Sequence, residues 1–154
     1  LHNVQLNIVG DGEKRRELEA LSKEYAVNAD FLGTMPMKDI PNEMQKNDVL
    51  VLPSLYDGWG AVVNEALTQG LYVVCSDKCG AKDLLHEDYR GAVFRNNDAM
   101  NLHTRLAALT DNISVLRQNR KGRIDWAKAS ISGKVISKYM IDWLMMGDGK
   151  CPWK

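Results

Sequence analysis

Val49 to Leu52 constrains the fold more than any other part of this 154-residue chain. The four residues are all aliphatic, so a strand formed by them presents apolar side chains on both faces. Strands of that kind occur inside parallel sheets that are covered by helices. The run therefore predicts a buried strand in an α/β domain.

Strand and helix signals alternate on both sides of this run. Other short apolar runs predict strands at 6–9, 29–32, 72–75 and 91–94. Helices are predicted near 13–25, 42–46, 61–69 and 81–85. Pro41 is expected to open the second of these helices, and Gly70 to end the third. Strands that alternate with helices imply a parallel sheet with right-handed crossovers.

The last third of the chain has the pattern of helices. Asp98 and Asn112 are each expected to cap a helix, and a final helix is expected over 132–146. Because no linker, repeat or low-complexity tract divides the chain, we expect one domain over residues 1–146. The tail at 147–154 contains Gly and Pro without periodicity and is expected to be flexible.

Charge and cysteine content disfavour several classes of protein. The chain carries 20 basic and 20 acidic residues, whereas general nucleic-acid binders carry a basic surplus, so we expect no nucleic-acid partner. Cys75, Cys79 and Cys151 show no C-x-x-C spacing, which disfavours a metal site and indicates thiols in a reducing cytosol. No apolar run approaches the roughly 20 residues that span a bilayer.

The chain begins at Leu1, inside or just before its first strand. It has no initiator Met, and it has no charged segment followed by an apolar one, as in a signal peptide. We therefore expect a cytoplasmic protein and interpret the chain as an excerpt from a longer one.

The segment Asp57-Gly58-Trp59-Gly60 connects the Val49–Leu52 strand to the helix expected to begin near Ala61. Glycines allow the backbone close to a ligand, and N–H groups at a helix start attract anions. Glu65 follows one to two turns into that helix, beside apolar residues that predict a buried stripe. A carboxylate there needs a partner, and two vicinal ribose hydroxyls would supply charge-assisted hydrogen bonds. The layout suggests a nucleotide-linked ligand.

Each of these features also has a purely structural interpretation. Asp57 could cap the helix, and Glu65 could be a solvated helix charge. Gly10-Asp11-Gly12 also joins a strand to a helix, but Arg15 at the third position of G-x-G-x-x-G disfavours a dinucleotide fingerprint. That turn either only redirects the chain or lines a ligand cleft at the strand ends. Cys79-Gly80-Ala81 has the same two interpretations.

Several motifs, in order along the chain, resemble those of one family. They are Asn7–Gly12, Phe31–Gly33, Val51–Ser54, Asp57–Glu65, Ala66–Gly70 and Val73–Asp77. Together they resemble the C-terminal half of retaining glycosyltransferases with two facing Rossmann-like domains. That group includes sucrose synthase and many bacterial polysaccharide and lipid glycosyltransferases. The resemblance implies an α/β fold: a Rossmann-like parallel sheet flanked by helices, with extra C-terminal helices.

The resemblance implies roles for individual residues. As candidate catalytic residues, Asp57 would contact hydroxyls of the donor sugar and Glu65 would hold the ribose hydroxyls. Thr34 and Met35 would border the nucleobase. Backbone N–H groups after Asp57 would receive the diphosphate or sugar, from the stretch Gly58, Trp59, Gly60, Ala61 and Val62. Gly10 adds a turn that could line the same cleft.

The resemblance also implies what binds. The donor substrate would be a nucleotide-sugar, with no cofactor and no metal, because N–H groups, a helix dipole and basic side chains neutralise the leaving diphosphate. The acceptor would be a sugar, lipid or polysaccharide bound by an N-terminal domain that this chain lacks. The full protein would act in polysaccharide biosynthesis and could associate peripherally with a membrane.

This chain departs from the family pattern at several places. Asp57 stands where Glu is commoner, which leaves the donor sugar open. Trp59 stands where Phe is usual, and Cys79 where Gly is frequent. The phosphate-binding Arg and Lys of the family precede this chain, so we expect it alone to bind donor weakly and to transfer nothing.

Two other functions stay open on the sequence. A nucleotide-sugar 2-epimerase has the same two-domain design and needs no acceptor. A non-catalytic α/β module that binds a partner protein would use none of these residues for chemistry.

Overall fold

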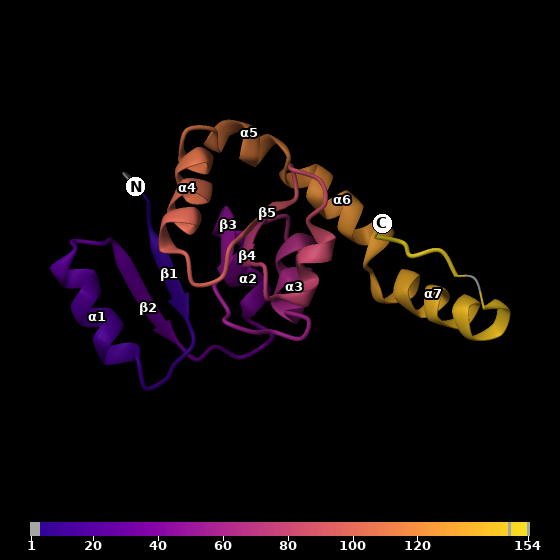
Figure 1. The fold of residues 1–154 in the computed structure, drawn as a ribbon, viewed down its shortest axis with the longest axis horizontal. Coiled ribbons are helices and arrows are strands. Elements are labelled where there is room, and N and C mark those ends of the chain that lie inside the picture. Colours follow the sequence, from indigo (N-terminus) through magenta and orange to yellow (C-terminus); the bar gives the residue numbers. More distant parts are fainter. Residues whose placement is uncertain (1–3, 148, 154) are drawn as a thin grey trace. The chain divides into compact units, whose positions relative to one another are not determined.

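The computed structural model describes residues 4–147 and 149–153. Its helices and strands divide into two compact units, Leu1–Asn42 and Glu43–Lys154. In Figure 1 the first unit is indigo and the helices that end the second unit are orange to yellow. Whether residues 1–146 act as one domain stays a prediction.

The first unit is a βαβ motif. Strand β1 (Leu6–Val9) is followed by helix α1 (Arg15–Glu24) and strand β2 (Ala29–Gly33). The strands pair in parallel, beginning with Leu6 opposite Ala29. None of the described residues from 4 to 42 is buried. Two strands and one helix therefore leave these residues without a core.

The second unit is built around a parallel sheet in the order β3-β4-β5. Its first elements, in chain order, are helix α2 (Ile40–Gln45, which begins before the unit boundary), strand β3 (Val49–Leu52), helix α3 (Ala61–Thr68), strand β4 (Tyr72–Ser76), the 3-10 helix η1 (Gly80–Leu84) and strand β5 (Gly91–Phe94). Helix α3 packs on β4 and buries Val63, Ala66 and Leu67. This packing fixes the start of α3 just beyond the carboxyl end of β3.

Four helices complete the second unit: α4 (Ala99–Thr110), α5 (Ile113–Gln118), α6 (Arg120–Ser130) and α7 (Gly133–Met146). Arg123 of α6 is the largest fully buried side chain among the described residues. Its guanidinium donates hydrogen bonds to the carbonyl oxygens of Gly70 (2.8 Å), Tyr89 (3.0 Å) and Leu116 (2.7 Å). One buried cation thus ties α6 to the end of α3, to the turn before β5 and to α5.

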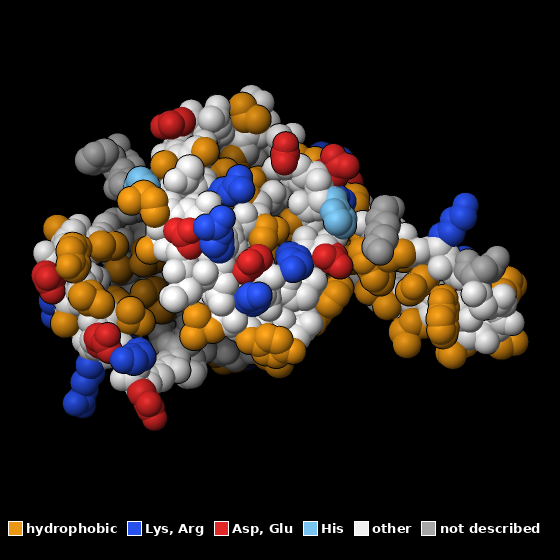
Figure 2. All heavy atoms as spheres, viewed as in Figure 1, with side chains coloured by type: hydrophobic (Ala, Val, Ile, Leu, Met, Phe, Trp, Pro, Cys, Tyr) orange, Lys and Arg blue, Asp and Glu red, His pale blue; other side chains and the backbone are white. Residues whose placement is uncertain are grey.

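Hydrophobic side chains gather on α7 (Figure 2), which exposes Met140, Ile141, Trp143, Leu144, Met145 and Met146. After α7 the chain turns back along the helix (Figure 1), and the Trp153 ring meets the Tyr139 ring edge-on, with centroids 5.6 Å apart. Flexibility of the tail at 147–154 stays a prediction, and residues 148 and 154 lie outside the described residues. No helix in the described ranges is both long and apolar enough to cross a membrane.

Most of the expected elements are confirmed. Strands β3 and β5 have the predicted bounds, and the Asp98 carboxylate caps α4 by accepting from the Asn101 N–H (2.9 Å). Two details are wrong. Asn112 makes no capping hydrogen bond with its side chain. Helix α2 begins at Ile40, so Pro41 lies second in its first turn, where a missing N–H removes no helical hydrogen bond.

The single parallel sheet that we expected is present as two. No ladder among the described strands joins β1 and β2 to the β3-β4-β5 sheet. β3 is half-buried along its length rather than buried, because it lies at the edge of its sheet. β4 has a neighbour on both sides and is buried from Val73 to Ser76.

Candidate functional site

The start of α3 presents unused N–H groups. The loop Asp57–Gly60 follows the strand β3 and ends at Gly60, which has a left-handed φ of 87° and is the N-cap of α3. Among the described residues, no group accepts a hydrogen bond from the N–H of Gly60, Ala61 or Val62. Three such donors at the positive end of a helix dipole form a site for an anion.

The Asp57 side chain stabilises the loop and does not cap helix α3. Its Oδ1 accepts a hydrogen bond from the Trp59 N–H (3.1 Å). No side chain caps α3, so the interpretation of Asp57 as a helix cap is wrong. The other carboxylate oxygen of Asp57 receives no hydrogen bond from any described residue and can accept one from a ligand.

The segment Lys78–Ala81 holds this loop in place through hydrogen bonds on its protein side. The Asp57 N–H donates to the Lys78 carbonyl oxygen (3.1 Å), and the Gly80 N–H donates to the carbonyl oxygen of Asp57 (3.1 Å). The Trp59 carbonyl oxygen accepts from the Ala81 N–H (2.6 Å) and from the Cys79 thiol (3.1 Å). These N–H groups are consumed within the protein, so the interpretation of Cys79-Gly80-Ala81 as a structural turn is the one that fits.

Two glycines allow the loops to approach this closely. A Cβ on Gly60 would lie 2.5 Å from the Cys79 Sγ. A Cβ on Gly80 would overlap the Gly58 carbonyl oxygen. By contrast, a Cβ on Gly58 would meet nothing within 4 Å. Gly60 and Gly80 are therefore required for packing, whereas Gly58 leaves open space above the loop.

Trp59 lies at the rim of the loop and is 41% exposed. Its Nε1–H donates to the Asn64 Oδ1 (2.8 Å), and its ring meets the Trp153 ring edge-on with centroids 6.4 Å apart. The sequence reasoning missed both partners. Asn64 could have been found as the polar side chain one turn into the helix after Trp59, but nothing local pointed to Trp153.

Glu65 lies on the solvent face of α3. It is exposed, and no described residue forms a hydrogen bond or ion pair with its carboxylate. The expectation that it borders a buried stripe and needs a partner for that reason is wrong. The buried face consists of Val63, Ala66 and Leu67, and a residue two positions after Val63 points away from it. Its carboxylate is thus free to accept hydrogen bonds from a ligand.

The remaining candidate residues belong to the first unit. Gly10 has a φ of 129°, and its N–H donates to the Gly33 carbonyl oxygen (2.7 Å). Thr34, which is exposed, and Met35, which is half-buried, follow directly. The structure therefore brings Gly10 beside the turn that carries Thr34 at the carboxyl ends of β1 and β2. The five loop and helix residues 58–62, with Asp57 and Glu65, belong to the second unit.

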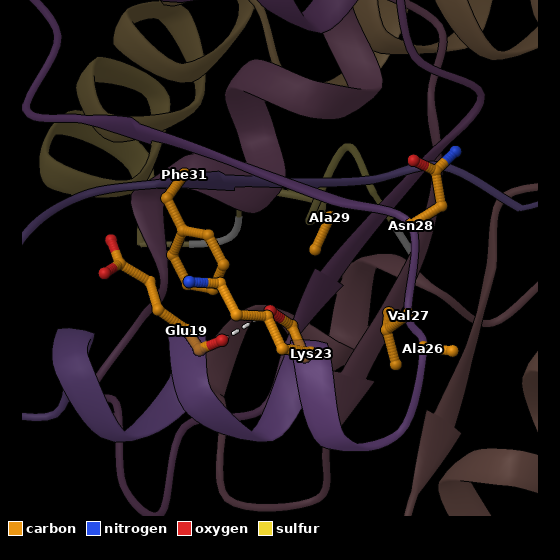
Figure 3. A pocket seen from close by; sticks show the side chains of 8 residues that line it. Glu19, Lys23, Ala26, Val27, Asn28, Ala29 and Phe31 are labelled. Carbon is orange, nitrogen blue, oxygen red and sulfur yellow. Dashed lines mark hydrogen bonds between the residues drawn. The ribbon is translucent and has the colours of Figure 1, made fainter.

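A hollow of about 540 Å³ in the first unit contains none of these residues. Figure 3 shows its lining, which includes Glu19 and Lys23 of α1 and Asn28 and Phe31 at β2. It lies near the amino end of β2, whereas ligands of open α/β sheets bind at the carboxyl ends. We assign no function to it.

Two thiols and one lysine lie in or just after β4, near the loop. Burial, and after it the proximity of Cys79, raises the pKa of Cys75 to about 12, so that thiol stays protonated at neutral pH. Lys82 Nζ donates to the Asp77 carbonyl oxygen (2.7 Å) in the turn after β4 and was not among the sequence candidates. Within the described ranges no three His, Cys, Asp or Glu side chains gather as a metal site, and a reaction without metal stays a prediction.

Known proteins resemble this chain in sequence. The profile of the family described as glycosyl transferases group 1 matches residues 1–124. The UDP-Gal:alpha-D-GlcNAc-diphosphoundecaprenol alpha-1,3-galactosyltransferase of Escherichia coli is 28% identical over 123 residues, 76% of this chain and 31% of that protein. Protein CapJ of Staphylococcus aureus is 30% identical over 144 residues, 92% of this chain and 35% of that protein. The chain thus spans about a third of the length of these relatives.

Solved structures resemble it in fold. WaaG, a glycosyltransferase involved in lipopolysaccharide biosynthesis, superposes with a TM-score of 0.74 at 26% identity, over 96% of this chain and 39% of that one. Anabaena HepE in complex with UDP-glucose gives a TM-score of 0.78 at 21% identity, over 94% of this chain and 41% of that one. These likenesses, with the family match, show a glycosyltransferase domain of the GT-B type and confirm the expected α/β architecture.

Proposed function

We propose, since the chain belongs to the glycosyl transferases group 1 family, that it is the donor-binding domain of a retaining glycosyltransferase. The full protein transfers a sugar from a nucleotide-sugar to an acceptor. One observation carries the proposal: the N–H groups of Gly60, Ala61 and Val62, at the start of α3, have no acceptor among the described residues. Two carboxylates that can still accept hydrogen bonds, those of Asp57 and Glu65, stand on either side of them in the sequence. The complex of the related-fold HepE with UDP-glucose supports a nucleotide-sugar as the donor.

The anion site suits a diphosphate. Phosphate oxygens placed over residues 58–61 accept hydrogen bonds from the three N–H groups and lie at the positive end of the α3 dipole. Because Gly58 has open space above it, the diphosphate can approach the backbone closely. The main chemical task of this half is to stabilise the charge of the departing diphosphate, which is an electrostatic role without proton transfer. No metal and no cofactor is required for that step in this proposal.

The two carboxylates bind the parts of the donor on either side of the diphosphate. Asp57 accepts a hydrogen bond from a hydroxyl of the transferred sugar through the oxygen that Trp59 leaves free. Glu65, which is exposed and unpaired among the described residues, accepts from the two ribose hydroxyls. Gly10, Thr34 and Met35 border the nucleobase; the resemblance to the family supports this assignment.

The acceptor and the place of action are also proposals. We place the acceptor on the part of the protein outside this chain, and we take it to be a sugar, lipid or polysaccharide. The E. coli relative is named for a diphosphoundecaprenol-linked acceptor, and WaaG is named for lipopolysaccharide biosynthesis. These names favour polysaccharide biosynthesis. The cytoplasm as the place of action, and peripheral membrane association of the full protein, are part of the proposal.

Binding measurements on the full-length protein test the function. Calorimetric titration with UDP, GDP and ADP is expected to give saturable binding of one of them, with its sugar derivative as donor. Glu65→Ala is expected to raise the donor KM and to lower kcat/KM by about tenfold or more, since it removes charge-assisted hydrogen bonds. Asp125→Ala, which removes an exposed carboxylate of α6, is the control and should change neither constant.

Asp57→Asn separates sugar binding from nucleotide binding. It is expected to lower turnover while the Kd of the nucleoside diphosphate stays close to that of the wild type, because Asn keeps a side-chain oxygen for the Trp59 N–H. If no nucleoside diphosphate binds at millimolar concentration, the donor assignment is wrong and a protein-interaction module becomes the better interpretation. Turnover of a nucleotide-sugar without any acceptor to its 2-epimer would replace the transferase with an epimerase.

A further inference from the structure

The loop Asp57–Gly60 has no core of its own to hold it. Gly58 and Trp59 are exposed, and only Gly60 is buried. The Trp59 carbonyl oxygen is one of the points where the segment Lys78–Ala81 holds the loop, and it accepts two hydrogen bonds. One comes from the Ala81 N–H, and the other comes from the side chain of Cys79. The Cys79 thiol is the side-chain half of this clamp, and therefore the half that a substitution can remove.

We infer that Cys79 is a positioning residue for the donor diphosphate: its thiol holds the Trp59 carbonyl so that the N–H groups of Gly60 and Ala61 face the phosphate oxygens. The inference rests on the proposed function, since it names what orients that same anion site. Cys79 itself touches no substrate. It is 1% exposed and lies behind the loop, on the protein side of Gly60.

The sulfur also limits where Gly60 can move. A Cβ on Gly60 would lie 2.5 Å from Sγ and 3.2 Å from the Leu52 Cδ2. The backbone of Gly60, with its φ of 87°, therefore sits directly against the thiol. If the Cys79 Sγ were removed, the loop would lose the hydrogen bond to the Trp59 carbonyl oxygen. It would also lose the packing contact against Gly60. A shift of that backbone changes the direction of the N–H groups in the first turn of α3. The affinity for a phosphate depends on the direction of these donors and is therefore sensitive to such a shift.

A neutral thiol suits this role better than a charged group. It donates one weak hydrogen bond and packs as a small hydrophobe. The neighbouring Cys75 is fully buried in β4, and burial raises its pKa to about 12. Cys75 therefore places no negative charge behind a loop that has to receive a diphosphate.

Cys75 supplies the matched control. Cys75→Ala and Cys79→Ala each delete one sulfur from a fully buried site, so both should lower the unfolding free energy by similar amounts. Only the Cys79 sulfur donates to the Trp59 carbonyl oxygen. Cys79→Ser keeps a donor at the same place on a shorter bond and serves as the conservative variant.

The test uses the full-length protein and the nucleoside diphosphate that the wild type binds most tightly among UDP, GDP and ADP. Its Kd and that of the matching nucleoside, which lacks phosphates, are measured by calorimetry or by competition. Cys79→Ala is expected to weaken the diphosphate by about fivefold to tenfold, the effect of one lost hydrogen bond, while nucleoside binding stays unchanged. Cys79→Ser should recover most of the diphosphate affinity, and Cys75→Ala should leave the ratio of the two Kd values at its wild-type level.

The outcomes separate this inference from the proposed function. If the wild type binds no nucleoside diphosphate, the function fails. If the wild type binds and Cys79→Ala keeps the wild-type ratio, or Cys75→Ala changes it equally, Cys79 is only a packing residue. Should Cys79→Ala not fold, Cys79→Val carries the test, because it fills the site without a hydrogen-bond donor: a raised ratio of the diphosphate Kd to the nucleoside Kd supports the inference, and an unchanged ratio overturns it.

Discussion

The two units differ in how they are held together. Every buried hydrophobic side chain of the described residues lies in the second unit, between Met44 and Ile131. In the first unit Leu18 and Leu21 of α1, which form its apolar face, are still 43% and 38% exposed. The second unit covers its sheet with helices, whereas the first has one helix for two strands. A βαβ motif of this size cannot bury enough apolar area to stabilise itself.

This difference bears on the site. The donors proposed for the diphosphate belong to the unit with a core, and the residues proposed for the nucleobase belong to the unit without one. A rigid backbone matters most where hydrogen-bond donors must point at the charged oxygens of a ligand. We therefore expect the second unit to set the geometry of the anion site and the first to exchange its amide hydrogens faster.

Removal of one leucine from each unit is expected to give the largest effect. Leu67→Ala should lower the unfolding free energy of the second unit by about 4 kcal/mol, because Leu67 is fully buried and the cavity adds to the lost burial. Leu18→Ala deletes the same atoms at a 43% exposed position and should cost about 1 kcal/mol. Denaturation is followed by tryptophan fluorescence, since all four tryptophans lie in the second unit, and by hydrogen exchange of peptides from residues 4–42. Equal losses for the two variants would show that both units share one cooperative core.

The same contrast applies to two arginines. Arg123→Met should destabilise the second unit by about 3 kcal/mol, because it leaves three carbonyl oxygens without their donor in a buried place. Arg15→Met is the control in the first unit: Arg15 donates to one carbonyl, that of Phe31, and pairs with Glu19 at a side-chain exposure of 32%. It should cost less than about 1.5 kcal/mol in the same measurements. A larger loss from Arg15→Met would reverse the ranking of the units.

Two glycines with positive φ isolate the effect of packing. Gly60 and Gly33 have φ values of 87° and 70°, so alanine at either place pays about 1–2 kcal/mol for the left-handed backbone. Gly60→Ala must also displace the Cys79 Sγ, whereas Gly33→Ala meets only the far end of the Arg15 side chain, at 3.4 Å. We expect about 2–3 kcal/mol for Gly60→Ala and about 1 kcal/mol for Gly33→Ala. Gly58→Ala, which adds a methyl group to open space, should leave stability nearly unchanged.

Local signals explain why much of the fold could be predicted. The aliphatic run of β3, the glycine at the end of α3 and the Asp98 cap each act over a few residues, and the sequence shows them directly. The anion loop was found for the same reason, since a strand, two glycines and a helix follow one another. The exposure of Glu65 could not be predicted from its apolar sequence neighbours alone, because consecutive residues of a helix point in different directions and Glu65 lies opposite the buried face.

Contacts between distant residues explain what could not be predicted. The Cys79 thiol meets Trp59 across 20 residues, and Arg123 meets the Gly70 carbonyl across 53. A cysteine in a turn and an arginine in a helix give no sign of which distant carbonyl oxygen they meet, and arginine is mostly exposed. The separation into two sheets likewise depends on strand pairing, which the alternation of elements does not specify.

The smallest expected effect concerns an ion pair between distant elements. Arg117 of α5 donates to both carboxylate oxygens of Asp48, at 3.1 Å and 2.8 Å, just before β3. Hydrogen bonding from Arg117 is the largest cause that lowers the pKa of Asp48 in the folded protein. A carboxyl group with a lowered folded pKa contributes stability above its unfolded pKa, near 4, and loses that contribution as the pH falls below it. Asp48→Asn should therefore make the stability of the second unit fall less steeply between about pH 5 and pH 3.

The first unit provides the control for this last variant. Lys14 and Glu17 form a pair at 2.7 Å within one turn of α1, both well exposed, so Glu17→Gln removes a local pair of similar length. A local exposed pair stabilises a fold very little. Glu17→Gln should leave the pH profile of tryptophan fluorescence unchanged, whereas Asp48→Asn should flatten its acid limb. An identical acid limb for Asp48→Asn and the wild type would mean that the Arg117–Asp48 pair adds nothing to the unit that carries the site.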